Sequence, residues 1–144
     1  MPLRQPPALG QTMLMPDTFK DRIVAITGGG TGLGKAMAVE FARLGATVAV
    51  LSRGDEHRER GVEQLRAMGG RAEGFAVDVR NPDLVAKSFD DVNDRLGPVD
   101  VLVNNASGTF ACPAEDLSLN GWRSVVEIVL DGTFFCSREF ARRR

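Results

Sequence analysis

The sequence lacks tyrosine altogether and has a single histidine among its 144 residues. It also has only two cysteines, Cys112 and Cys136, which do not have the C-x-x-C spacing of a zinc or redox motif. No histidine cluster accompanies them. We therefore expect no metal site and no disulfide framework, and we predict two packed thiols in a reducing compartment.

Long hydrophobic runs and an excess of one charge are also absent. No run approaches the roughly 18 apolar residues of a membrane span, and the N-terminus lacks the apolar core of a signal peptide. Eighteen basic and 19 acidic residues leave a net charge of −1, which argues against nonspecific binding to nucleic acid. We expect no membrane or nucleic-acid partner and a cytoplasmic location.

Residues 1–16 differ from the rest of the chain because they contain four prolines and no hydrophobic periodicity. This composition predicts a disordered leader, with either Met1 or Met15 as the true start. The whole chain is 43% hydrophobic and 26% charged, so residues 17–144 fit one globular domain with a hydrophobic core.

Within this domain, β-rich apolar runs alternate with helical patterns. Strands are predicted at residues 22–27, 47–51, 71–77 and 99–103. The continuous apolar run at 22–27 is typical of a strand covered on both faces, and 47–51 is predicted to be a second buried strand. Helical spacing is found at 33–44, at 55–68, from 82 and from 117. We expect Asn81 and Ser118 to cap the last two helices. The residues expected to face inward are Leu84, Val85, Phe89, Val92 and Leu96, and then Trp122, Val125, Val126, Val129 and Leu130.

This alternation predicts right-handed crossovers and hence an α/β fold with a doubly wound parallel sheet of strand order 3-2-1-4. The winding of such a sheet reverses between its first and fourth strands. We expect a ligand crevice at the carboxyl ends of these two strands.

A glycine-rich stretch, Thr27 to Gly34, lies between the first strand and the first helix and reads TGGGTGLG. Glycine brings backbone N–H groups close to a ligand, and the helix N-terminus offers unpaired donors and the positive end of a dipole. The stretch therefore predicts a pyrophosphate site. Its spacing is T-G-x-x-x-G-x-G rather than G-x-G-x-x-G, because Leu33 stands where the last glycine of that pattern would fall.

Two further motifs follow the third and fourth strands, Asp78-Val79 and Asn104-Asn105-Ala106-Ser107. Together with the glycine loop they resemble the short-chain dehydrogenase/reductase family, whose Asn-Asn-Ala-Gly appears here with serine in the last place. The resemblance implies a partial, Rossmann-like dinucleotide-binding domain over residues 17–144, without the family's later strands.

The resemblance also implies cofactor contacts. The loop would wrap the pyrophosphate through Thr27, Gly28, Gly30, Thr31, Gly32, Leu33 and Gly34. Asp78 and Val79 would hold the adenine, Asn105 and Ala106 would hold the nicotinamide-side ribose, and Ser107 completes the set. The alternatives are a glycine loop that only joins packed elements and an aspartate that only shapes a turn.

The end of the second strand distinguishes NADP from NAD. A carboxylate there would bind the ribose 2′-hydroxyl, whereas an arginine would accept a 2′-phosphate. Ser52 and Arg53 occupy this position, so we predict NADPH rather than NADH. The alternative is a solvated loop arginine, and Asp55 and Glu56 weaken the local positive potential. His57 is expected to be a surface residue.

Within the family, residues 110–134 are most similar to 2,4-dienoyl-CoA reductases. Most members have an asparagine three residues before Gly132, where it helps to hold a proton-relay water, but this chain has Val129 there, as that branch does. We interpret Asp131 as a helix residue rather than a replacement. The resemblance implies an NADPH-dependent oxidoreductase of fatty acid β-oxidation with an acyl-CoA substrate, and a homo-oligomer.

The family's proton donor is a tyrosine four residues before a lysine, and this chain has none. We therefore identify no catalytic residue and expect the chain alone to be inactive. The arginine run at 142–144 is either a solvated helix end or the sign of a truncated or shifted reading frame. The alternative functions are a catalytically silent cofactor-binding fragment and a 3-oxoacyl or other carbonyl reductase.

Overall fold

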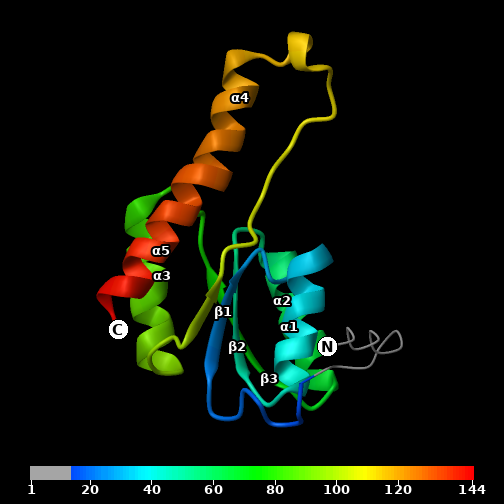
Figure 1. Ribbon diagram of the computed structural model, residues 1–144, viewed down its shortest axis with the longest axis vertical. Coiled ribbons are helices and arrows are strands. Elements are labelled where there is room, and N and C mark those ends of the chain that lie inside the picture. The colour runs from blue at the N-terminus through cyan, green and yellow to red at the C-terminus, as the bar shows by residue number, and fades with distance from the viewer. Residues whose placement is uncertain (1–13) are drawn as a thin grey trace, which may run out of the picture.

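Four parallel strands form the centre of the molecule, with helices on both faces (Figure 1). The computed structural model describes residues 14–144. The strands are β1 (Ile23–Thr27), β2 (Thr47–Ser52), β3 (Arg71–Ala76) and β4 (Val101–Val103), in the order β3-β2-β1-β4. The helices are α1 (Gly32–Arg43), α2 (Asp55–Ala67), α3 (Pro82–Arg95), α4 (Leu119–Val126) and α5 (Gly132–Arg142). The predicted fold class and strand order are confirmed. Most of the predicted leader lies outside the described residues.

The apolar runs of β1 and β2 are continuous because both faces of the sheet are covered. Side chains alternate between faces along a strand, so neighbouring residues enter different clusters. Ala25, Ala49 and Leu51 pack with residues of α3 and with Cys136 of α5. Val24, Ile26, Val48 and Val50 pack on the other face with residues of α1 and α2.

Both predicted helix caps are present. The side chain of Asn81 accepts hydrogen bonds from the backbone N–H groups of Asp83, at 3.0 Å, and Leu84, at 3.1 Å. Ser118 Oγ accepts one from Gly121 N at 3.0 Å. These caps satisfy donors that the first helical turn leaves unpaired, so they fix where α3 and α4 begin.

The predicted inward face of α3 is correct except at one residue. Val85, Phe89 and Val92 are at most 1% exposed, and Leu96 packs against the same cluster. Leu84, however, is 44% exposed. It precedes Val85 directly and therefore points about 100° away from it around the helix axis.

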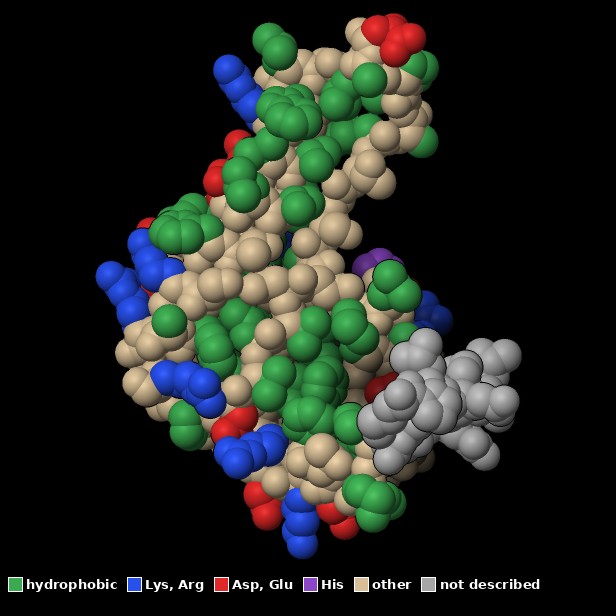
Figure 2. Space-filling model, viewed as in Figure 1, with side chains coloured by type: hydrophobic (Ala, Val, Ile, Leu, Met, Phe, Trp, Pro, Cys, Tyr) green, Lys and Arg blue, Asp and Glu red, His purple; other side chains and the backbone are tan. Residues whose placement is uncertain are grey.

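The inward face predicted for the last helix is wrong at Trp122, Val129 and Leu130, which are 58%, 44% and 66% exposed. The predicted single helix is divided by a turn of π-helix at Glu127–Asp131, and α4 projects beyond the sheet (Figure 1). Figure 2 shows apolar side chains gathered along this projection. Periodicity identified an apolar face, but it does not identify what covers that face.

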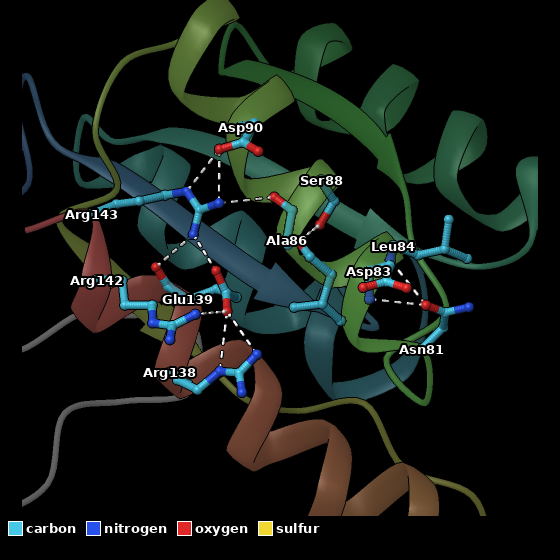
Figure 3. A network of polar contacts seen from close by, with 11 residues as sticks. Asn81, Asp83, Leu84, Ala86, Ser88, Asp90, Arg138, Glu139, Arg142 and Arg143 are labelled. Carbon is cyan, nitrogen blue, oxygen red and sulfur yellow. Dashed lines mark hydrogen bonds and ion pairs between the residues drawn. The ribbon is translucent and has the colours of Figure 1, made fainter.

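A charged network attaches α5 to α3 (Figure 3). Glu139 is buried and accepts hydrogen bonds from Arg143 at 2.6 Å, Arg138 at 3.1 Å and Arg142 at 3.3 Å. Arg143 also donates to Asp90 of α3 at 2.7 Å. The hydrogen bond from Arg143 is the main reason why the pKa of Glu139 lies below its ordinary value. The arginine run is therefore not simply a solvated helix end, because Arg143 joins two helices.

The two cysteines have different surroundings. Cys136 is buried, and burial raises the pKa of its thiol to about 11. Cys112 is exposed, so the prediction of a packed thiol is wrong there. Within residues 14–144, no cluster of three or more His, Cys, Asp or Glu side chains is arranged to hold a metal ion. Nor is any helix in that range long and apolar enough to cross a membrane.

Candidate functional site

A cavity of about 150 Å³ opens at the carboxyl ends of the strands, where the crevice was predicted. The segments that follow β1, β2, β3 and β4 all contribute to it. Its lining residues are Gly28, Leu51, Ser52, Arg53, Val77, Asp78, Val79, Ala106, Ser107 and Ile128. The sheet therefore brings together residues of all the predicted cofactor motifs.

A larger open groove of about 610 Å³ lies beside α2 and β3. It contains none of the predicted cofactor residues. Several of the charged side chains along it have partners already, because Arg95 pairs with Glu73 and Arg58 pairs with Asp55. The smaller cavity at the strand ends is thus the stronger candidate for a ligand site.

Of the predicted loop residues, Gly28 lines the cavity and the others do not. Gly32 begins α1 with a φ of +52°, a conformation that favours glycine, and a Cβ built there would meet nothing within 4 Å. Thr31 precedes it as the N-cap, and the first turn contains no acidic residue. Leu33 is exposed. The N-terminus of α1 therefore presents unpaired N–H groups and a positive dipole end to open space.

Two other glycines of the loop are packing positions. A Cβ on Gly34 would overlap the carbonyl oxygen of Gly28, and a Cβ on Gly30 would overlap that of His57 in α2. A Cβ on Gly61 of α2 would in turn lie 2.8 Å from the Cα of Gly30. The glycines thus let α1 and α2 lie directly against the loop, and His57 itself is exposed, as expected.

Thr27 connects the loop to the end of β4. Its buried hydroxyl accepts hydrogen bonds from the backbone N–H groups of Asn105, at 3.0 Å, and Ala106, at 2.9 Å. In return, Nδ2 of Asn105 donates to the carbonyl oxygen of Thr27 at 3.0 Å. Asn104 Nδ2 donates to Ser137 Oγ of α5 at 3.0 Å. These connections have no local sequence signal, because their partners are far apart in the chain.

Three charged side chains meet at the edge of the cavity. Arg80 donates to both carboxylate oxygens of Asp78, at 2.9 Å to Oδ1 and 2.5 Å to Oδ2. Arg53 lies farther away, with NH1 3.9 Å from the same Oδ2. The hydrogen bond from Arg80 is the main cause of the lowered pKa of Asp78. Arg80 was not among the predicted site residues, and its position two residues after Asp78 is the only sequence signal for it.

This arrangement fits the adenosine end of a dinucleotide. The open helix N-terminus suits a phosphate, Arg53 provides a positive charge, and the Asp78 carboxylate can accept a hydrogen bond from an exocyclic amine. The lowered pKa keeps Asp78 ionised near neutral pH, so it is unsuited to donate a proton. The site therefore has the geometry of a binding site, and we identify no proton donor among its residues.

Comparisons with known proteins agree with this geometry. The profile of the family described as short chain dehydrogenase matches residues 22–143. A Bacillus subtilis (strain 168) protein named probable 2,4-dienoyl-CoA reductase is 44% identical over 124 residues, which cover 86% of this chain and 49% of that protein. A Caenorhabditis elegans protein named probable 2,4-dienoyl-CoA reductase decr-1.2, (3E)-enoyl-CoA-producing, is 39% identical over 144 residues, covering 99% of this chain and 45% of that protein.

A solved structure is also similar. A short chain dehydrogenase from Bacillus anthracis matches with a TM-score of 0.81 and 43% identity, covering 87% of this chain and 52% of that one. The chain spans about half the length of the curated relatives that it matches.

Proposed function

This chain belongs to the short-chain dehydrogenase family, and from that premise we propose that residues 17–144 are the cofactor-binding part of an NADPH-dependent reductase of 2,4-dienoyl-CoA thioesters. One observation carries the proposal. Gly28 of the glycine loop, Arg53 and Asp78 line a single cavity in a chain with relatives named as probable 2,4-dienoyl-CoA reductases.

In this proposal different predicted residues bind different parts of the dinucleotide. The loop from Thr27 to Gly34 and the first turn of α1 hold the pyrophosphate. Asp78 and Val79 orient the adenine, and residues 105–107 orient the nicotinamide-side ribose. When bound, NADPH supplies a hydride for reduction of the conjugated thioester. The chain's own contribution is to bind and orient that hydride source.

Arg53 is the residue that selects NADPH in this proposal. Its side chain is 69% exposed and only loosely paired with Asp78, so it is free to turn toward a 2′-phosphate. We expect Arg53→Ala to weaken NADPH binding about tenfold, because a charge-assisted hydrogen bond is lost, and to leave NADH binding nearly unchanged. Isothermal titration of each variant with both cofactors measures this.

The matched control is Arg60→Ala. Arg60 is an equally exposed arginine on α2, and it pairs with Glu56. Removing it changes the net charge by the same amount and should alter neither affinity. A preference for NADH that persists in both the original chain and Arg53→Ala would refute the cofactor assignment.

The reductase activity itself needs a proton donor, and we identify none in this chain. It contains no tyrosine, and Asp78 is held ionised. We expect no NADPH oxidation when the chain is mixed with a 2,4-dienoyl-CoA, and turnover when it is fused to the second half of the Bacillus subtilis relative. Absorbance at 340 nm measures both reactions.

The results for the chain alone and for the chimera distinguish the alternatives. Turnover by the chain alone would contradict the account of the missing acid. A folded but inactive chimera that still binds NADPH would support a catalytically silent binding module instead. A chimera carrying Arg53→Ala is the internal control, because it should retain NADH-dependent turnover and lose its preference for NADPH.

A further inference from the structure

We propose that Arg80 is a positioning residue for cofactor selection, because it occupies the Asp78 carboxylate and thereby leaves Arg53 able to bind a 2′-phosphate. This inference rests on the proposed NADPH function. It adds a residue that touches no part of the cofactor and acts through Asp78.

The geometry of Asp78 carries the inference. Its carboxylate is 23% exposed and lies between two guanidinium groups that differ in how they approach it. Arg80 donates to both oxygens, and its backbone N–H adds a bond to Oδ1 at 3.1 Å. Arg53 makes one longer approach of 3.9 Å. The bidentate hydrogen bonds from the Arg80 guanidinium therefore hold the Asp78 carboxylate firmly, whereas Arg53 interacts with it only weakly.

An unpaired carboxylate at this place would oppose NADPH in two ways. It would repel the negative charge of a 2′-phosphate bound by Arg53, and it would compete with that phosphate for the Arg53 guanidinium. Arg80 reduces both effects by balancing the charge of Asp78. It also faces Glu127, whose negative charge lies near its guanidinium.

Neutralisation by Arg80 does not remove Asp78 from adenine recognition. A carboxylate has about four lone-pair sites, so bonds from Arg80 leave acceptor capacity for an exocyclic amine. The pair therefore separates two requirements of the site. Asp78 provides an acceptor for the base, and Arg80 cancels the charge that this acceptor would otherwise place beside the 2′-phosphate.

The test uses two ligands that differ only in the 2′-phosphate, 2′,5′-ADP and 5′-AMP. Calorimetric titration of the full chain gives the ratio of their dissociation constants. We expect Arg80→Gln to reduce the preference for 2′,5′-ADP about fivefold, a modest change because the groups are partly solvated. The reduction should shrink as ionic strength rises. Arg80→Lys, which keeps the charge, should retain most of the preference.

The decisive comparison is the double variant. Asp78→Asn removes the charge that Arg80 balances, so Asp78→Asn/Arg80→Gln should regain the preference shown by Asp78→Asn alone. If Arg80 has a purely structural role, or contacts the phosphate directly, the double variant should show no such recovery. That result would overturn the inference.

The ratio also separates this inference from the function on which it rests. If the original chain prefers 2′,5′-ADP and Arg80→Gln keeps the full preference, the role of Arg80 is refuted and the NADPH proposal stands. If the original chain shows no preference, both are refuted. Unfolding midpoints in urea confirm that each variant compared is folded.

Discussion

Replacing Gly34 with alanine is expected to lower the free energy of unfolding by about 3 kcal/mol and to abolish dinucleotide binding. The added Cβ would overlap the carbonyl oxygen of Gly28 and lie 2.5 Å from Nδ2 of Asn105. Neither neighbour can move freely, because Asn105 Nδ2 donates to the carbonyl oxygen of Thr27 and the backbone N–H of Gly28 donates to the carbonyl oxygen of Leu51. The alanine would therefore force α1 away from the loop that it supports.

The sign of the change in the free energy of unfolding distinguishes a tertiary clash at Gly34 from an effect of helix propensity. Gly34 lies within α1, where alanine normally stabilises a helix by about 1 kcal/mol relative to glycine. Urea unfolding and NADPH titration measure the two losses. The control is Gly54→Ala, whose Cβ would meet only His57 Cδ2 at 3.6 Å, an ordinary contact. A Gly34→Ala protein as stable as this control would contradict the close approach of α1 to the loop.

The fold could be predicted because its signals are local. The continuous apolar runs of β1 and β2 require two covered faces, and the side-chain oxygens of Asn81 and Ser118 lie within reach of the N–H groups that they cap. Alternation of strands and helices then restricts the topology to a parallel sheet with a reversal point. The place of the cavity follows from that reversal.

The supports of the site could not be predicted, because they join residues that are distant in sequence. The Thr27 hydroxyl meets backbone groups 78 and 79 residues away, and Arg143 meets Asp90 across 53 residues. The sequence motif assigned Asn105 to a ribose, whereas its amide donor also holds the loop. The ribose contact remains a prediction beside that structural role.

A contact between residues close in sequence could not be predicted either. Arg80 lies two residues from Asp78, but an arginine side chain in a turn can adopt many conformations. Only the folded chain shows that it hydrogen-bonds both oxygens of the carboxylate. The same limit applies to Trp122 and Leu130, whose helical spacing defines a face without defining its neighbour.

Thr27→Val is expected to cost about 3 kcal/mol of stability and to loosen the site, although valine has nearly the same shape as threonine. Thr27 is 2% exposed, and its hydroxyl accepts hydrogen bonds from the N–H groups of both Asn105 and Ala106. Valine would leave these two donors unpaired in the interior, where each costs about 1–3 kcal/mol. We expect faster hydrogen exchange at both amides and weaker NADPH binding.

Thr27→Ser is the matched control because it keeps the hydroxyl and removes only a methyl group, at a cost of about 1 kcal/mol. If the hydroxyl is what joins β1 to the segment after β4, the serine variant retains slow exchange at the two amides while the valine variant does not. Equal stability and equal exchange in the two variants would show instead that packing alone holds these segments together. The glycine loop would then owe its position to the contacts of Gly34 and Gly30, rather than to the hydrogen bonds that begin at Thr27.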